Sequence, residues 1–165
     1  MSQMPLDLDA KKAVLRSFTY GLYAVSAGHG GERGIFTANW LTQVSFDPPL
    51  VALSVERESS TLELIRSSGR FVIVPLRSDQ SKLAGNLGRP RARAGDKFEV
   101  YDLSATSAAL GDPVFDGGLG YCVCVVQSET DAGDSVVFIG EVIEAQIGEP
   151  GDPLTMREAG FRHAG

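Results

Sequence analysis

The chain has little of what several common functions require. Its 165 residues include only two histidines and two cysteines, and 21 acidic residues outnumber 15 Lys and Arg, which gives a net charge of −6. Nucleic acids and anionic membranes bind clustered positive charge, so this balance argues against both as general partners. No apolar run approaches the roughly 20 residues that a membrane-spanning helix needs. The first residues also lack the basic and apolar regions of a secretory signal, so we expect a cytoplasmic location.

The scarcity of cysteine and histidine also limits the chemistry. Cys122 and Cys124 lie one residue apart in an apolar run, where a disulfide has poor geometry and no further Cys or His stands at metal-ligand spacing. We therefore expect core thiols and no metal site. His29 lies in a Gly-rich turn, which predicts an exposed loop position. The sequence holds no Ser-His-Asp arrangement, so no catalytic side chain is predicted.

Glycine and proline, in contrast, are plentiful. The 19 Gly and 8 Pro, together with few helical windows, indicate many turns between short strands. A chain of this length is expected to form one domain, with a core over about residues 10–146. The tail, 147–165, is expected to hang free or to clasp a neighbouring subunit. The predicted fold is mainly β: an antiparallel, Greek-key-like β-barrel of roughly six or seven strands, with a few α-helices covering its ends.

The spacing of apolar residues and the turn signals place the elements. Asp9 is expected to cap the first helix, and Ser78 the third. Helices are expected over 9–18, 61–68 and 79–87, and strands over 20–27, from 35 onward, and over 50–55, 71–76, 119–127 and 135–146. A weaker segment over 97–103 has no clear type.

Residues 37–45 form a polar stretch that is typical of a small-molecule site. Thr, Asn, Gln and Ser alternate there with Trp40, Leu41 and Val44, so amide and hydroxyl groups are flanked by apolar side chains. Pro48 and Pro49 then stop any helix and force an extended entry into the following apolar strand. We interpret this stretch as one wall of a site for a flat heterocycle.

The strand after the two prolines ends in a hydroxyl-rich turn. Ser59, Ser60 and Thr61 stand directly before a helical pattern, and Ser60 with Glu63 fits a capping box. Free amides and hydroxyls at a helix start bind phosphate, although the same residues are most often a plain cap. Together with the polar stretch, this turn favours a phosphate-bearing cofactor.

A basic cluster follows the third helix. Arg89, Arg91, Arg93 and Lys97 lie within nine residues of a loop-like segment. A solvated loop and a role beside an anionic ligand remain equally good interpretations of this cluster.

The sequence resembles the flavin reductase-like, FMN-binding split-barrel family, which includes flavoredoxin and the reductase components of two-component monooxygenases. The resemblance extends from Phe18 to about Val142. It rests on five segments: TYGLYAVSA, TANWLTQVSFDPPLVALSV, STLELIRSSGRFVIVPLRSDQ, GDKF and GDSVVFIGEV. The VS-x-x-PPL element followed by Thr-x-x-x-Ile and a Gly-Phe strand is the most specific part.

The resemblance implies a homodimer with FMN near the subunit interface; FAD is the alternative flavin. The first group of residues would contact the flavin ring and ribityl chain, the second would hold the phosphate, and the third would lie near the flavin. They are Thr37, Ala38, Asn39, Trp40, Leu41, Thr42, Val44 and Ser45 for the first, Ser59, Ser60 and Thr61 for the second, and Lys97 and Phe98 for the third.

The implied function is an NAD(P)H-dependent flavin reductase that supplies reduced flavin to an oxygenase or another acceptor, with FMN carrying the redox chemistry. Two departures from the family pattern concern the reductant. Ser135 stands where many members have His after Gly-Asp, and Val74 stands where Asn is frequent. Ser135 favours an alternative, a flavoredoxin-like FMN electron carrier that does not use NAD(P)H directly. A third hypothesis, an interaction module without cofactor, is disfavoured by the intact stretch from 37 to 61.

Overall fold

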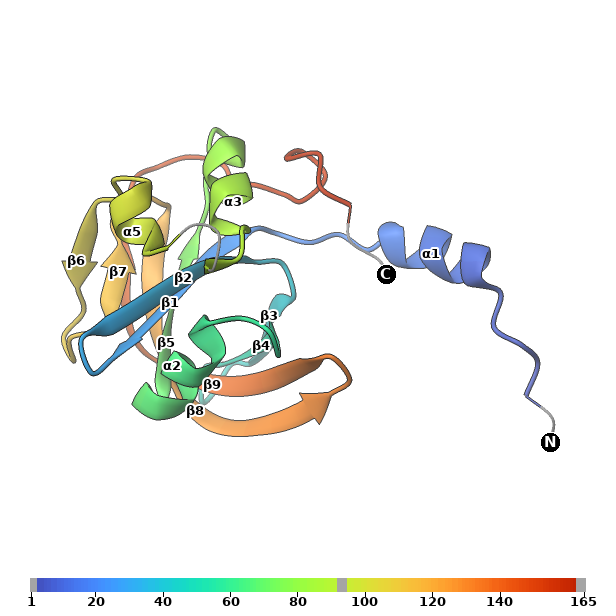
Figure 1. The fold of residues 1–165 in the computed structure, drawn as a ribbon, viewed down its shortest axis with the longest axis horizontal. Coiled ribbons are helices and arrows are strands. Elements are labelled where there is room, and N and C mark those ends of the chain that lie inside the picture. The colour runs from blue at the N-terminus through green and yellow to red at the C-terminus, as the bar shows by residue number, and fades with distance from the viewer. Residues whose placement is uncertain (1–2, 92–94, 163–165) are drawn as a thin grey trace.

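The computed structural model describes residues 3–91 and 95–162, and its centre is one seven-stranded antiparallel sheet (Figure 1). The mainly β, antiparallel prediction is confirmed. The strand order is β2-β1-β5-β8-β9-β4-β3. The strands are β1 (Tyr23–His29), β2 (Glu32–Ala38), β3 (Leu41–Ser45), β4 (Leu50–Glu56), β5 (Arg70–Pro75), β8 (Gly120–Ala132) and β9 (Ser135–Ile147); β6 (Ala105–Ser107) and β7 (Pro113–Phe115) form a separate pair.

Two hairpins define the register of the sheet. The β1–β2 turn contains Gly30 and Gly31 at φ of 61° and 82°, a left-handed conformation that glycine adopts without strain. Gly133, at φ of 64°, does the same between β8 and β9. The exposed second half of β8 pairs with the mostly buried first half of β9, and the exposed end of β9 pairs with the half-buried start of β8.

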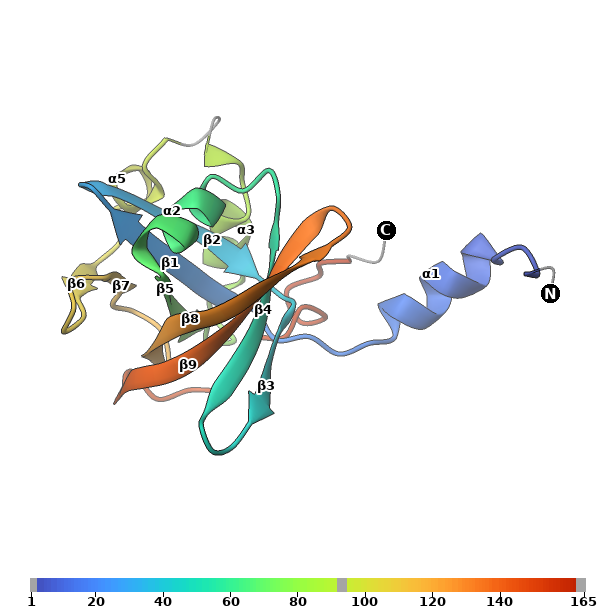
Figure 2. The same cartoon turned by 90° about the horizontal axis from the view of Figure 1, so that it is seen from below.

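The expected barrel is open. β2 and β3 are the two edges of the sheet, and no ladder joins them among the described residues. Figure 2 shows β8, β9, β4 and β3 turning across β1 and β5, so the sheet curls without closing. The twist of long antiparallel strands produces this curl, and closure requires a complete hydrogen-bonded circuit that is missing here.

Both faces of the central strands are buried, which explains their almost uninterrupted apolar sequence. On β5, Val72 and Val74 belong to one hydrophobic cluster, whereas Phe71 and Ile73 belong to the other. The first cluster includes residues of α3 (Ser81–Leu87) and α5 (Lys97–Val100), and the second includes residues of α2 (Thr61–Ser68). Alternate side chains of one strand thus serve two separate cores.

The first helix differs from its prediction. α1 (Leu8–Arg16) begins one residue earlier than expected, because Asp7 is the cap: its carboxylate accepts from the backbone N–H groups of Asp9 and Ala10 at 3.0 and 2.9 Å. In Figures 1 and 2, α1 extends away from the rest of the molecule. Within the described residues, no helix has the length and apolar character needed to cross a bilayer.

The C-terminal segment packs on its own chain rather than hanging free. Thr155 bridges to Gly21 and Pro153 bridges to Arg77, with Leu154 fully buried between them. The backbone N–H of Met156 donates to the Tyr20 carbonyl at 2.9 Å. The free tail was wrongly expected because the partners of this segment lie more than seventy residues earlier in the chain, beyond the reach of local patterns.

Candidate functional site

A two-residue connection joins the two edges of the sheet. β2 ends at Ala38 and β3 begins at Leu41, so Asn39 and Trp40 cross directly from one edge strand to the other. The Trp40 carbonyl accepts from the Ser54 backbone N–H at 3.0 Å, which ties the crossing to β4. The polar stretch predicted from the sequence therefore lies where the sheet is open.

The first half of this stretch is fixed by contacts from distant parts of the chain. The Thr37 hydroxyl donates to the Ala84 carbonyl of α3 at 2.5 Å, and the Asn39 side-chain amide donates to the Met156 sulfur at 3.4 Å. Ala38 is buried. These residues form a rigid base, with Thr37 and Asn39 already engaged by the protein.

The second half, β3, is more exposed and presents an edge. Its side chains Thr42, Gln43 and Val44 face solvent, whereas Leu41 and Ser45 are half-buried. β3 pairs on one side with β4, with a register shift between Gln43 and Ser45. Edge strands leave backbone donors and acceptors unpaired on their outer side, and on β3 these groups lie beside apolar side chains.

The helix start after β4 carries the hydroxyl groups in three different environments. Ser60 is exposed and its side chain makes no capping hydrogen bond, while the Ser59 hydroxyl accepts from the Thr61 backbone N–H at 3.3 Å. The predicted capping box is wrong, because Glu63 pairs with Arg66 at 2.9 Å instead. The uncapped Ser60 hydroxyl at a helix N-terminus fits an anionic oxygen.

Thr61 lies inside the fold rather than on its surface. Only 1% of it is exposed, and a Cβ atom added at Gly34 would lie 2.6 Å from the Thr61 hydroxyl oxygen. Gly34 is required on β2 because this threonine approaches the strand so closely. The contact places the α2 start beside β2 three residues before Thr37, a separation of about 10 Å along a strand.

Lys97 is a buried structural cation in this structure. Its ammonium donates to the carbonyls of Ile35 at 3.1 Å and Leu87 at 2.6 Å, and the residue is 7% exposed. Burial lowers the pKa of Lys97 from 10.5 to about 8. The lysine thus joins the end of α3 to β2, two residues before Thr37.

Phe98 packs directly behind this lysine. It is 2% exposed, and the Arg33 guanidinium lies over its ring at 4.5 Å from the centroid. Arg33 also pairs with Asp96 at 3.1 Å, whose carboxylate caps α5 through the Phe98 backbone N–H at 2.9 Å. Lys97 and Phe98 therefore support β2. They lie on α5, whereas the hydroxyl-rich turn lies at the start of α2.

Sequence reasoning missed Met156 and Arg57 at this site. Met156 was part of the expected tail. The available signal was the spacing of two residues between the apolar Leu154 and Met156, both of which are buried in the structure. Arg57 follows β4 and precedes Ser59, and its guanidinium donates to Asp131 at 2.7 Å and to the Gly133 carbonyl at 3.0 Å. Of the basic cluster, Arg89 is exposed and Arg91 is half-buried, while Arg93 lies outside the described residues.

The remaining predictions concern cysteine, histidine and metals. Cys124 is fully buried and free, as predicted, and Cys122 is half-buried and free. His29 is exposed, as predicted. Over residues 3–91 and 95–162, no group of three or more His, Cys, Asp or Glu side chains could hold a metal ion.

Comparison with known proteins gives one consistent family. The model of the flavin reductase like domain matches residues 15–165. The chain is 31% identical to the reductase component of 4-nitrophenol 4-monooxygenase/4-nitrocatechol 2-monooxygenase from Rhodococcus opacus, over 96% of this chain and 82% of that protein. It is 32% identical to the high molecular weight rubredoxin of Moorella thermoacetica, over 86% of this chain but only 62% of that protein.

A solved structure shares the fold over almost its full length. The crystal structure of BorF, the flavin reductase component of a bacterial two-component tryptophan halogenase, superposes with a TM-score of 0.79 at 28% identity. The match covers 93% of this chain and 95% of that one. The open, curled sheet is thus similar to that of a flavin reductase.

Proposed function

This chain belongs to the flavin reductase-like family, and on that premise we propose that it uses NAD(P)H to reduce FMN and passes the reduced flavin to a separate oxygenase. The observation that carries the proposal is the position of the polar stretch and the uncapped helix start beside the same strand, β2. One elongated ligand with a heterocycle at one end and a phosphate at the other spans these two places.

In this proposal the polar stretch holds the ring. Bound flavin supplies the hydride chemistry, and the chain supplies position and hydrogen bonds. Asn39 and the backbone of β3 contact the polar edge of the ring, while Trp40, Leu41 and Val44 provide apolar contact. Thr37 and Ala38, together with Thr42 and Ser45, complete the group predicted from the sequence.

The phosphate lies at the start of α2. Ser60 donates its free hydroxyl, Ser59 lies beside it, and Thr61 contributes from the buried side of the helix start. Arg57 adds a positive charge two residues before Ser59, although it shares that charge with Asp131. Hydrogen bonds from hydroxyls and helix-start amides to a charged phosphate are stronger than those to neutral acceptors.

Lys97 and Phe98 act from behind β2 in this proposal. Because Lys97 binds the Ile35 carbonyl, it fixes the strand that carries Thr37, and Phe98 packs under the same region. They therefore affect the flavin indirectly, because they hold β2 and its residue Thr37 in position.

A second function has one observation in its favour. Ser135, in the place of the family's frequent histidine, is 2% exposed and its hydroxyl bonds only to Asp134, at 3.2 Å, among the hydrogen bonds of the described residues. A buried serine offers no imidazole to a nicotinamide. An FMN electron carrier is therefore the alternative, and one matched relative is named a rubredoxin rather than a reductase.

The protein is proposed to work as a homodimer, with the second subunit covering part of the flavin. The open edge of the sheet and the exposed Phe46 and Val44 beside it, which are 91% and 50% exposed, support this arrangement. Neighbouring exposed apolar side chains of this kind are a feature of interaction surfaces.

An anaerobic titration separates the reductase from the carrier. Purified protein is loaded with FMN, and its visible absorbance band is followed as NADH or NADPH is added. Rapid bleaching by one of them is the expected result. A protein that retains FMN but is bleached only by dithionite is the carrier, and a protein that takes up no flavin contradicts both functions.

A further inference from the structure

α1 extends away from the rest of the described chain (Figure 1). None of its side chains is buried; Leu8 is 65% exposed and Val14 is 59% exposed. Met4 and Leu6, just before it, are 89% and 66% exposed. A nine-residue helix is marginal in water without tertiary contacts, so packing of its apolar face normally maintains such a helix.

The side chains of α1 fall on two faces. At 100° per residue, Leu8, Val14 and Leu15 lie within one half of the helix together with Lys11, whereas Asp9, Lys12 and Arg16 lie within a narrower arc on the other. This pattern is that of a helix that lies on an apolar surface with its charged face in water.

The described part of the chain also forms an apolar groove. It lies at the beginning of β8 and the end of β9, holds about 290 Å³, and is lined mainly by apolar atoms. Leu119, Cys122, Ala145 and Ile147 contribute to its walls, and Ile147 is 92% exposed.

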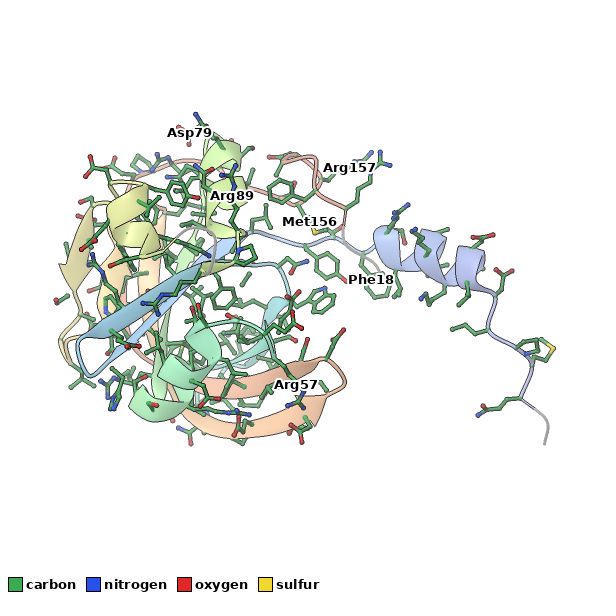
Figure 3. The ribbon with its side chains drawn as sticks, viewed as in Figure 1. Phe18, Arg57, Asp79, Arg89, Met156 and Arg157 are labelled. Atoms are coloured by element: carbon green, nitrogen blue, oxygen red, sulfur yellow. The ribbon has the colours of Figure 1, made fainter. Side chains whose placement is uncertain are left out.

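The helix cannot reach the groove of its own molecule. Figures 1 and 2 place α1 at one end of the molecule and the end of β9 toward the other. The chain after α1 is tied down at Tyr20 and Leu22, which bond to Met156 and Leu154. Figure 3 shows Phe18 at the point where the helix leaves the body, and its ring centroid lies 6.4 Å from that of Tyr20. An occupant of the groove must therefore come from another molecule.

Charge complementarity identifies that occupant as α1 of a second copy. The helix carries Lys11, Lys12 and Arg16. The last part of β9 and the turn after it, 141–149, contain Glu141, Glu144 and Glu149 and no basic residue. In a chain with a net charge of −6, a basic element that faces an acidic one favours association of two copies.

We propose that α1 of each subunit lies in the β8–β9 groove of the other, so that the two subunits exchange their N-terminal helices. This inference rests on the proposed homodimer and gives it a location, but it is independent of flavin binding and of NAD(P)H. Two symmetric arms bury the apolar face of each helix and both grooves at once.

The native Cys122 provides a direct test, because it lines the groove and is half-exposed. Leu8→Cys and Val14→Cys place a thiol on the apolar face of α1, and Arg16→Cys is the matched control on the charged face. Full-length protein is oxidised with diamide at low concentration and resolved on a non-reducing gel. We expect a covalent dimer from an apolar-face variant, at least tenfold less from Arg16→Cys, and none once Cys122→Ser is added.

Sedimentation equilibrium gives a second measurement without cross-linking. Val14→Glu should raise the dimer dissociation constant at least tenfold, whereas Lys12→Glu, on the opposite face, should change it far less. A wild-type monomer, a dimer indifferent to Val14→Glu, or equal cross-linking from both helix faces overturns the proposal. Because α1 buries no side chain within the subunit, the variants are expected to keep the fold.

Discussion

The Asn39 side-chain amide donates a hydrogen bond to the Met156 sulfur at 3.4 Å, and this contact joins the crossing between the two sheet edges to the C-terminal segment. Met156 is 6% exposed, and its own backbone N–H is held by Tyr20. The segment therefore determines the orientation of an amide in the stretch proposed to bind the flavin ring.

Replacing Met156 should weaken flavin binding through this contact. Met156→Leu preserves most of the volume but removes the sulfur acceptor, and thioether acceptors are weak, so we expect a loss of about 1 kcal/mol or less in flavin affinity. Fluorescence titration of FMN measures this loss of affinity. Met4→Leu, in the exposed segment before α1, is the control. An unchanged dissociation constant in both Met156→Leu and Asn39→Ala would remove Asn39 from the site.

The two hydroxyl residues at the α2 start should differ in their effects: the exposed Ser60 should affect mainly phosphate binding, whereas the buried Thr61 also supports the fold. Ser60→Ala is expected to lower FMN affinity by about 1.5–3 kcal/mol, the range for hydrogen bonds to charged groups, without changing stability. Riboflavin, which lacks the phosphate, serves as the matched ligand and should bind both proteins equally. Equal loss for FMN and riboflavin would place the phosphate elsewhere.

Gly34 should tolerate no side chain, because its space is taken by Thr61. Gly34→Ala places a Cβ atom 2.6 Å from the Thr61 hydroxyl oxygen, and such overpacking costs about 1–3 kcal/mol of unfolding free energy. Gly85→Ala is the control: its Cβ meets only Phe161 at 3.7 Å, and alanine favours the α3 helix. Urea unfolding compares the two, and equal stability would contradict the close contact.

Lys97 should make stability depend on pH in a defined direction. Burial lowers its pKa to about 8 in the folded protein, against 10.5 when unfolded. Between these values the unfolded chain binds more protons, so stability rises with pH from about 8 toward 10.5; the cost of the buried charge is fully present below 8.

Lys97→Met removes this rise, and the difference between wild type and variant is the quantity to measure. Urea unfolding at several pH values on both sides of 8 gives it. The variant also loses the hydrogen bonds to Ile35 and Leu87, which lowers its stability at every pH. Burial also raises the pKa of Cys124 and Tyr23, but these groups affect both proteins alike. Parallel stability curves would show that Lys97 does not titrate in this range.

Local patterns were sufficient for most of the strands but not for the contacts that build the site. Strands β1, β2, β4, β5, β8 and β9 follow from apolar runs and glycine turns, which act over a few residues. The β6–β7 pair was missed, because its three-residue strands offer no periodicity. The open sheet was also missed, since pairing of edge strands depends on how far the whole sheet curls.

In the candidate site, too, local patterns identified the segments but not their long-range contacts. The polar stretch and the hydroxyl turn were found as sequences, and the structure places both beside β2. The burial of Lys97 and Thr61 was not predicted, because it depends on residues such as Leu87 and Gly34 that approach only in three dimensions. Sequence patterns identify polar residues, whereas their exposure is a property of the packed molecule.

The crossing at Asn39 and Trp40 has a mechanical consequence. Any outward or shearing movement of β2 relative to β3 must pass through these two residues, because they alone connect the strands along the chain. A molecule bound at this crossing resists separation of β2 from β3, so its binding energy stabilises the whole domain. Amide hydrogen exchange should accordingly slow in β2 and β3 together when a ligand occupies the crossing.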